Sequence, residues 1–353
     1  MAIAGTVLVT GGAGFIGSAV IRHLIDRTNC RVVNVDSLTY AATLESVAAV
    51  SDSDRYCFEK ADIGDGDRMR NIFASYEPEI VLHLAAQTHV DRSIDDPTVF
   101  VEANVVGTFR LLEVVRDYLR YHPSIRAGFR FCHVSTDEVF GSLEDEGAFD
   151  EGTPYSPRSP YSASKAAADH LVRAWNHTFD VPVIVANCSN NFGPFQFPEK
   201  LIPHMIISAL EGRPLTVYGD GRHVRDWLYV EDHARALIQI AERGTTGETY
   251  LIGGRSERTN LDVTSAICRA LDSLQPLSGG ISYRDRIEFV QDRPGHDRRY
   301  AVDCGKLERE VGWCREVPFE EGIEKTVRWY LANESWWRPL RERYTGHRLG
   351  LGT

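Results

Sequence analysis

The stretch TVLVTGGAGFIGSAVIRHLI, from Thr6 to Ile25, is the part of the sequence that most clearly indicates the fold. It reads as a short apolar strand, a glycine-rich loop and the beginning of a helix, in that order. Gly11, Gly14 and Gly17 give the spacing G-x-x-G-x-x-G. In that spacing the first glycine allows a tight turn, the second lets the backbone approach a pyrophosphate, and the third lets the helix pack on the strand. The stretch therefore predicts a dinucleotide site whose phosphates meet the N–H groups of the helix start.

The pattern of apolar runs beyond this stretch extends the same unit. Five further runs rich in Val, Ile and Phe read as strands, at residues 31–36, 55–62, 80–86, 129–136 and 181–189. Amphipathic helical patterns lie between them, at residues 19–27, 67–76, 99–120 and 161–179. Apolar strands that alternate with helices are typical of a parallel sheet covered on both faces. The predicted fold class is therefore α/β, with a Rossmann-type doubly wound parallel sheet.

The composition changes after about residue 190. Residues 190–205 and 211–227 are rich in Gly and Pro, with aromatic and basic residues between them, and further helical patterns follow. This change predicts a smaller, partly irregular α/β domain that binds substrate. We expect residues 1–189 to form the dinucleotide-binding Rossmann domain, residues 226–245 to return to it, and residues 190–353 to form mainly the substrate-binding domain.

The amino-acid composition and net charge argue against several classes of function. Lys and Arg number 39 against 50 Asp and Glu, a formal net charge of −11, which argues against binding nucleic acid or an anionic membrane. The start of the chain lacks the features of a signal peptide, and no apolar run approaches the roughly 20 residues that span a bilayer. The seven cysteines are scattered without a C-x-x-C pair, which indicates reduced thiols and a cytoplasmic location. The twelve histidines show no H-x-x-x-H or H-E-x-x-H spacing, so we expect no metal.

Strand ends downstream of the glycine loop favour NAD as the dinucleotide. Asp36 ends the second predicted strand, where a carboxylate can hold a ribose 2′-hydroxyl and would repel a 2′-phosphate. Asp62 can reach the adenine edge, and Ala85 and Ala86 permit close passage of the cofactor. Turn glycines with solvated acids are the alternative interpretation. The expected cofactor-binding residues are Gly11, Gly14, Phe15, Ile16, Gly17, Asp36, Ser37, Leu38, Thr39, Asp62, Ile63, Leu84, Ala85, Ala86, Tyr161 and Lys165.

A candidate redox site follows in PYSASK, which opens a long helical pattern. Tyr161 and Lys165 stand four residues apart and so share one helix face. A lysine ammonium near a phenol lowers the pKa of the phenol, which could then take an alcohol proton. Thr136, at a strand end about 25 residues upstream, can hydrogen-bond the same alcohol oxygen. A solvated Tyr–Lys face is the alternative, because Y-x-x-x-K is common by chance.

These features together resemble the extended short-chain dehydrogenase/reductase superfamily and, within it, most closely the dTDP-glucose 4,6-dehydratase family. The resemblance runs through nearly the whole chain, in TGGAGFIGS, NVDSLTYA, HLAAQTHVDRSI, STDEVFG, SPYSASKAAADHLVRA, NNFGPFQFPEKLIP, VRDWLYVEDHARAL and DRPGHDRRYAVD. The strand-end hydroxyl is followed by Asp137 and Glu138, whereas the epimerases of the superfamily usually carry small or apolar residues there.

The resemblance implies a lyase that converts dTDP-glucose to dTDP-4-keto-6-deoxy-glucose and water. It implies oxidation at C4, elimination across C5 and C6, and return of the hydride to C6, so that tightly held NAD+ is regenerated in each cycle. The implied catalytic residues are Thr136, Asp137, Glu138, Tyr161 and Lys165. Asp137 would be the acid toward the C6 oxygen and Glu138 the base at C5. An acid pair exposed in a loop is the alternative.

The resemblance also implies a set of contacts to the nucleotide sugar, named Gln87, His89, Thr136, Asn190, Glu199, Lys200, Leu201, Thr216, Tyr218, Arg225, Asn260, Arg293, His296 and Tyr300. Arg225 would offer a planar, charged guanidinium to the diphosphate. Two positions depart from the family pattern. Gln87 stands where bacterial members commonly carry Glu, and Ala103 replaces a frequent Thr.

Several alternatives remain open at this stage. The substrate could be another nucleotide sugar, such as UDP- or CDP-glucose, and a 4-epimerase is disfavoured by the acid pair. An NAD-dependent regulator of the same fold is disfavoured by the intact Tyr–Lys site. The family pattern implies a homodimer built on two long helices, here at residues 99–120 and 164–179, although ordinary core packing would also explain their apolar faces.

Overall fold

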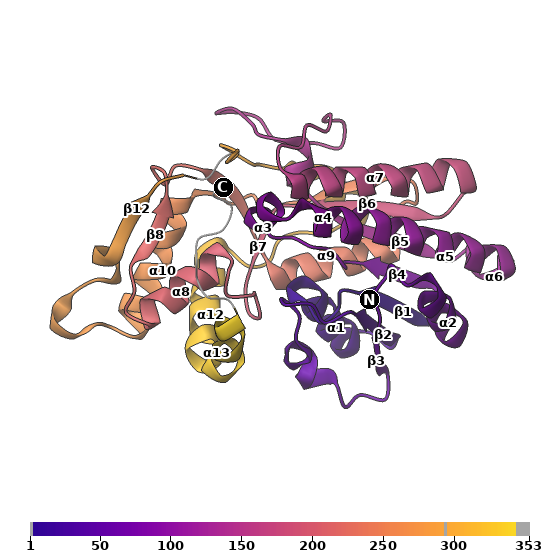
Figure 1. Ribbon diagram of the computed structural model, residues 1–353, viewed down its shortest axis with the longest axis horizontal. Coiled ribbons are helices and arrows are strands. Elements are labelled where there is room, and N and C mark those ends of the chain that lie inside the picture. Colours follow the sequence, from indigo (N-terminus) through magenta and orange to yellow (C-terminus); the bar gives the residue numbers. More distant parts are fainter. Residues whose placement is uncertain (1–2, 293–294, 344–353) are drawn as a thin grey trace.

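A seven-stranded sheet forms the larger part of the computed structural model, which describes residues 3–292 and 295–343 (Figure 1). The strand order is β10-β6-β5-β4-β1-β2-β3, and every neighbouring pair is parallel. Its strands are β1 (Thr6–Thr10), β2 (Arg31–Asp36), β3 (Tyr56–Lys60), β4 (Ile80–His83), β5 (Arg130–Thr136), β6 (Val183–Cys188) and β10 (Thr249–Ile252). The predicted doubly wound parallel sheet is confirmed, with β10 as a seventh strand that the sequence analysis did not assign.

Helices cover both faces of this sheet, and each face has its own apolar core. One core joins the sheet to α1 (Phe15–Arg27), η1 (Leu44–Val50), α9 (Val230–Arg243) and α11 (Gly305–Val311). The other joins it to α2 (Gly66–Tyr76), α5 (Thr108–Tyr121) and α7 (Pro160–Phe179). Burial on both faces explains why the strands read as continuous apolar runs.

Short elements lie between the longer helices and the strands. They are α3 (Val90–Asp95), α4 (Pro97–Phe100), the π-helical turn η2 (Val101–Gly107), α6 (Pro123–Arg126) and η3 (Asp137–Phe140). The single helix expected at residues 99–120 is therefore divided by a π-helical segment before α5. Such π turns widen a helix locally and are frequent near functional sites.

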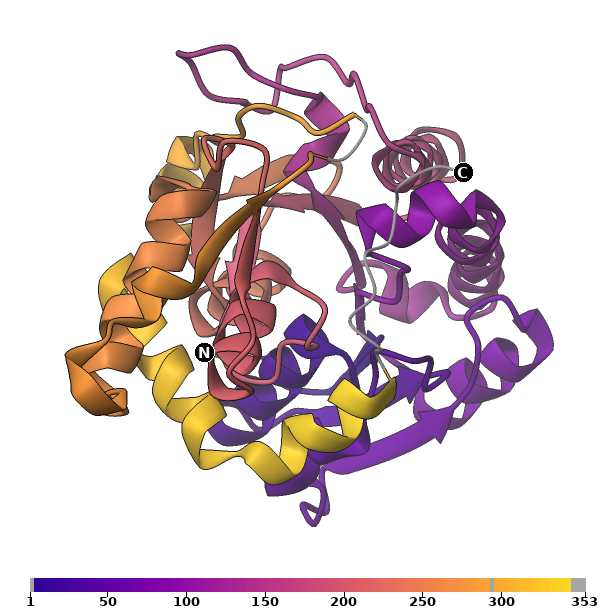
Figure 2. The same cartoon turned by 60° about the vertical axis from the view of Figure 1, so that its left-hand side comes forward.

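The second part of the molecule packs around a third apolar core beside the sheet. It contains β7 (Asn190–Phe192), β9 (Val224–Tyr229) and β11 (Glu257–Thr259) in one small sheet, and β8 (Leu215–Tyr218) with β12 (Ile287–Val290) in another. Its helices are α8 (Leu201–Leu210), α10 (Asn260–Leu274), α12 (Phe319–Ala332) and α13 (Glu334–Arg343), with the short turns η4 (Ser278–Gly280) and η5 (Tyr283–Arg286). Figure 2 shows the orange and yellow helices of this part on the side opposite the purple helices that cover the sheet. Among the described residues, no helix has the length and apolar character needed to cross a membrane.

The first turn of α1 lies directly on the glycine loop. A Cβ atom on Gly17 would lie 2.2 Å from the carbonyl oxygen of Gly11 and 2.8 Å from the Cα of Gly12. Both of those atoms belong to backbone that cannot turn aside. The close approach of α1 to the loop therefore requires glycine at this position.

We predict that Gly17→Ala destabilises the protein by about 1–3 kcal/mol, the usual cost of overpacking a tight contact. The measurement is the urea midpoint of unfolding. Gly66→Ala is the matched control, because Gly66 also lies in the first turn of a helix and its nearest atoms belong to the flexible Arg70 side chain, 3.6 Å away. A Gly17→Ala protein that unfolds at the same urea concentration as the Gly66→Ala protein would contradict this packing argument.

Candidate active site

Two cavities meet at the carboxyl edge of the large sheet. The first, called here the glycine-loop cavity, has a volume of about 340 Å³ and is lined from the glycine loop to Tyr161 and Lys165. The second, called here the cleft cavity, has a volume of about 240 Å³ and is lined largely by the second part of the molecule. The residues that line both are Thr88, Glu138, Asn190, Glu199 and Lys200. A ligand in one cavity can therefore reach a ligand in the other.

The glycine loop packs directly on the residues that follow β4. Gly11 has φ +72°, and a Cβ atom there would lie 2.7 Å from the backbone nitrogen of Ala85. The same nitrogen donates a hydrogen bond to Thr10 Oγ1 at 3.2 Å. β1 and β4 are neighbours at which the strand order reverses, which is where open α/β sheets bind their ligands.

Asp36 is fixed at the rim of the glycine-loop cavity. Its Oδ2 accepts the backbone N–H of Ala13 at 3.0 Å, and its Oδ1 accepts that of Leu38 at 2.7 Å. Burial raises the pKa of Asp36, and these two N–H donors oppose the rise. Each carboxylate oxygen keeps further acceptor capacity, which suits the two hydroxyls of a ribose.

The donor set around the glycine-loop cavity fits NAD. Every residue expected to contact the cofactor lines this cavity except Leu38. Leu38 instead takes a left-handed conformation, with φ 57°, and gives its N–H to Asp36. The cavity is also lined by residues that the sequence analysis did not name as contacts, among them Ala42, Ala61, Ser189, Gln196 and Phe197.

Asp137 and Glu138 follow the end of β5. Both line the glycine-loop cavity, and Glu138 also lines the cleft cavity. Thr136 Oγ1 accepts the N–H of Glu138 at 3.3 Å and lies 3.3 Å from Asp137 Oδ1, to which it donates. Asp137 is 1% exposed, and its Oδ2 has no hydrogen-bond partner among the described residues. Burial, followed by the charges of Glu138 and Asp226, raises the pKa of Asp137 well above its ordinary value. Burial and the neighbouring carboxylates therefore favour the protonated, uncharged form of Asp137.

The helix α7 begins beside this strand end. Ser159 caps it together with Ser162 in a reciprocal capping box, and Pro160 occupies the first turn. Tyr161 and Lys165 are both buried on the face of α7 that meets the sheet. Lys165 Nζ donates to the carbonyl oxygen of Val134 at 2.9 Å.

The pKa of Tyr161 is raised, whereas the sequence analysis expected Lys165 to lower it. Burial, followed by the charge of Glu138, raises its pKa well above the ordinary value, and a hydrogen bond with Thr136 opposes that rise. The protein residues alone therefore hold Tyr161 as a phenol. Any lowering of its pKa by Lys165 is outweighed in this structure by burial and the neighbouring carboxylate.

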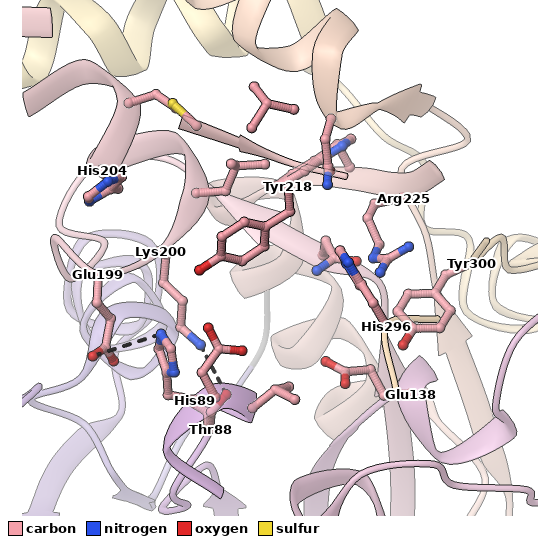
Figure 3. Close-up of a pocket in the computed structure, with 18 of the residues that line it drawn as sticks. Thr88, His89, Glu138, Glu199, Lys200, His204, Tyr218, Arg225, His296 and Tyr300 are labelled. Carbon is pink, nitrogen blue, oxygen red and sulfur yellow. Dashed lines mark hydrogen bonds and ion pairs between the residues drawn. The ribbon is translucent and has the colours of Figure 1, made fainter. Parts of the chain in front are cut away.

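The cleft cavity presents positive charge on both of its sides, from Arg225 beside Glu138 and from Lys200 across from it (Figure 3). Arg225 donates to the carbonyl oxygens of Val224 at 2.8 Å and Asp297 at 2.9 Å, and its guanidinium lies 4.2 Å from the ring centroid of Tyr300. The Tyr300 hydroxyl donates to Asp297. Figure 3 shows Arg225, Tyr300 and Glu138 on one side of the cavity, with Lys200 on the other. These contacts hold the Arg225 guanidinium in a fixed orientation.

Glu199 joins the two parts of the molecule. Its side chain is 1% exposed and accepts hydrogen bonds from the Tyr40 hydroxyl at 2.8 Å and from Arg92 Nε at 2.9 Å. His89 Nε2 lies 3.9 Å from the same carboxylate, and Lys200 Nζ donates to the carbonyl oxygen of Thr88 at 2.9 Å. These contacts hold residues 197–200 (FPEK) against the Rossmann part, next to both cavities.

The structure brings most of the residues expected to bind substrate into one place. The expected residues that line the cleft cavity are His89, Asn190, Glu199, Lys200, Leu201, Thr216, Tyr218, Arg225, Asn260, His296 and Tyr300. Gln87 and Thr136 line the glycine-loop cavity instead, as does Ala103. Arg293 lies outside the described residues. His204, Met205, Val217 and Trp227 also line the cleft cavity, although their apolar or helical contexts gave no sign of it.

One group of potential metal ligands lies beside the cleft cavity. His223 Nε2 and His296 Nδ1 lie 3.1 and 2.7 Å from the two oxygens of Asp292, and the three ligand atoms are within 4.8 Å of one another. The two imidazole rings stack in parallel, with centroids 3.7 Å apart and planes 13° apart. Parallel rings direct their nitrogens side by side and do not converge on a tetrahedral centre. Asp292 therefore contacts both imidazoles, through a hydrogen bond with His296 and a 3.1 Å contact with His223.

The parallel sheet, the Tyr161–Lys165 pair and the adjoining cleft define the class: this is an extended short-chain dehydrogenase/reductase. The family model described as GDP-mannose 4,6 dehydratase matches residues 8–326. The chain is 56% identical over 351 residues to dTDP-glucose 4,6-dehydratase of Neisseria meningitidis serogroup B, covering 98% of this chain and 99% of that one. It is 56% identical over 340 residues to dTDP-glucose 4,6-dehydratase 1 of Escherichia coli K12, covering 94% of each. The chain belongs to the dTDP-glucose 4,6-dehydratase family.

Solved structures agree in fold and differ in reaction. A dTDP-glucose 4,6-dehydratase of Streptomyces venezuelae, solved with NAD bound, has a TM-score of 0.87 and 41% identity, over 95% of this chain and 99% of that chain. A UDP-glucose 4-epimerase of Thermus thermophilus, in complex with NAD, has a TM-score of 0.81 and 29% identity, over 93% and 99%. The fold is therefore common to both reactions, and the side chains of the site must distinguish them.

Proposed function

We propose that this protein is an NAD-dependent dTDP-glucose 4,6-dehydratase that forms dTDP-4-keto-6-deoxy-glucose and water. The observation that carries the proposal is the pair Asp137–Glu138, placed by the end of β5 where the two cavities meet. A buried Asp137, whose pKa is raised above its ordinary value, lies beside a Glu138 that lines both cavities, and the two would supply one acid and one base to neighbouring carbons. An epimerase has no step that needs such a pair.

Bound NAD would accept the hydride from C4 of the sugar and later return it to C6. Tyr161 takes the proton of the C4 hydroxyl, and Thr136 hydrogen-bonds the same oxygen. Because burial holds Tyr161 as a phenol in the ligand-free site, its proton must leave before this step. The Lys165 ammonium, one turn along the same helix face, stabilises the phenolate that results.

Elimination uses the acid pair. The C4 ketone makes the C5 proton acidic, and Glu138 removes it. Asp137 gives its proton to the C6 oxygen, which leaves as water. The proton on Glu138 exchanges with solvent, and Glu138 then gives a solvent proton to C5 when C6 is reduced. Asp137 is reprotonated from solvent before the next cycle. Arg225 and Lys200 supply positive charge for the diphosphate across the cleft cavity.

The division of the chain supports the same function. We propose that residues 1–189 hold NAD, that residues 226–245 belong with them, and that residues 190–353 mainly bind the nucleotide sugar. α9 packs in the same core as α1, which supports the return of the chain to the first part. All seven cysteines are free thiols, and we propose a cytoplasmic location on that basis.

We expect the purified protein to convert dTDP-glucose to a 4-keto-6-deoxy product, detected by the absorbance that alkali develops from the ketone. UDP-glucose and CDP-glucose, incubated in parallel, should give much weaker signals. A signal from UDP-glucose alone would show that the base specificity is wrong. No signal from any of the three sugars would exclude the dehydratase function.

Glu138→Gln should lose exchange of the C5 proton with solvent while it retains oxidation at C4. The expected loss is at least about 100-fold, the lower range for removal of a general base. The measurement is deuterium uptake at C5, with cofactor reduction followed by its absorbance in the same sample. Asp137→Asn is the matched control, because it keeps the base and should therefore still exchange C5 while it fails to release water. Normal C5 exchange in the Glu138→Gln protein would refute the assignment of the base.

A homodimer is a further part of the proposal. Large apolar side chains are exposed along α4, η2, α5 and α7, namely Val99, Val101, Phe109 and Phe179. Phe109 packs edge-on against Trp175, and Trp175 against Phe179, so these three rings form one apolar cluster across α5 and α7. Contiguous apolar surface of this kind is typical of an interface between subunits.

Phe109→Glu should convert the dimer to a monomer at micromolar concentration, because it places a charge within this surface. Light scattering coupled to size-exclusion chromatography measures the mass. Tyr121→Glu is the control, since Tyr121 is exposed at the far end of α5. If the unchanged protein is already monomeric, the homodimer proposal is wrong.

A further inference from the structure

A buried carboxylate lies one helical turn beyond the redox pair. Asp169 follows Lys165 by four residues on α7, shares its inward face, and is 0% exposed. Its Oδ2 is the acceptor of three hydrogen bonds, from Ser135 Oγ at 2.9 Å, Tyr155 OH at 2.7 Å and Asn187 Nδ2 at 3.2 Å. An isolated carboxylate would be costly at this depth, so this density of donors indicates that Asp169 is held there as an anion.

His133 lies close to both the other oxygen of Asp169 and the Lys165 ammonium. His133 Nε2 lies 3.1 Å from Asp169 Oδ1 and 3.4 Å from Lys165 Nζ. Burial and the charge of Lys165 lower the pKa of His133 to about 4, so its ring is neutral at working pH. A neutral imidazole cannot balance the charge of the ammonium. The anion at Asp169 can.

None of the other titratable groups described below supplies a negative charge that could balance the Lys165 ammonium. His83, on β4, has a pKa lowered well below its ordinary value by burial and is neutral. Cys188, on β6, has a pKa raised above its ordinary value by burial, so it is a neutral thiol. Tyr155 is likewise a neutral phenol, and Arg173, bonded to it at 2.8 Å, adds positive charge. Burial lowers the pKa of Lys165, and the Asp169 carboxylate is the first group that opposes this.

The same carboxylate is tied to the catalytic strand end. Ser135, which donates to Asp169, immediately precedes Thr136. Asn187 Nδ2, which also donates to Asp169, is 3.1 Å from the carbonyl oxygen of Thr136. The end of β5 and the helix that carries Tyr161 and Lys165 are therefore fixed to one buried anion.

We propose that Asp169 is a positioning residue that keeps Lys165 protonated and fixes the end of β5 against α7. The proposal deepens the proposed function and rests on it only for the role of Lys165 in the redox step. Asp169 touches neither cavity.

The direct test is the pKa of Lys165, measured by ¹³C NMR of the full chain labelled at lysine Cε. The chain has only five lysines, Lys60, Lys165, Lys200, Lys306 and Lys325, and the Lys165→Met protein identifies the signal. In Asp169→Asn the pKa of Lys165 should fall by at least about one unit, the effect of losing an opposite charge at this range. Asparagine fits the site, because its oxygen can keep the three donors and its NH₂ can donate to His133.

Tyr155→Phe is the matched control, since it removes one hydrogen bond from Asp169 and leaves the charge. The pKa of Lys165 should then stay within a few tenths of a unit. An unchanged Lys165 pKa in Asp169→Asn, or an equal fall in both variants, would overturn the proposal. A Lys165 that is already neutral at pH 7 in the unsubstituted protein would also overturn it, and that measurement needs no variant to fold.

Activity gives a second readout. Loss of the Lys165 proton ends activity at alkaline pH, so a lower Lys165 pKa moves the alkaline limb of the kcat profile to lower pH. Asp169→Asn should show that displacement, and Tyr155→Phe should not. A fall in kcat without movement of the limb would mean a structural role only and would refute the proposal. The NMR titration uses no substrate, so its outcome is separate from whether dTDP-glucose is the sugar.

Discussion

The junction between the end of β5 and the start of α7 is the contact on which the site depends. The strand brings Thr136 and the acid pair to the sheet edge, and the helix brings Tyr161 and Lys165 to the same point. Buried polar contacts to Asp169 hold the two elements together. Since hydrogen bonds of this kind are directional, they fix the relative position of strand and helix more narrowly than apolar packing could.

The two adjacent carboxylates have different surroundings. Asp137 points into the protein and is almost fully buried, so water cannot stabilise its charge. Glu138 is half-buried and lines the cleft cavity on the same side as Arg225, with Lys200 on the other side (Figure 3). The turn of η3 separates the two side chains, so the proposed acid and the proposed base have different environments although they are neighbours in the sequence. The charge of Glu138 also contributes to the raised pKa of Asp137.

Dehydratases and epimerases share this fold, so the reaction is not a property of the sheet. In this chain Glu138 lines both cavities, and Asp137 lines the glycine-loop cavity beside it. Glu199, which lines both cavities, accepts hydrogen bonds from Tyr40 and Arg92 of the Rossmann part. The geometry of the sugar relative to the cofactor therefore depends on contacts between the two parts as well as on each part alone.

The sequence by itself determined the features that are encoded locally. The glycine loop, the first six strands of the sheet, and the pairing of Tyr161 with Lys165 follow from short spacings and from periodicity, because a turn, a strand or a helix face is set by neighbouring residues. Only the tertiary structure decided the rest: the seventh strand, the left-handed backbone of Leu38, the environment of Asp137 and the cluster around Asp169. These depend on residues far apart in the chain, as in the contact of Ser135 and Asn187 with one carboxylate. Burial and charge at such points are properties of the packed molecule, and no local pattern contains them.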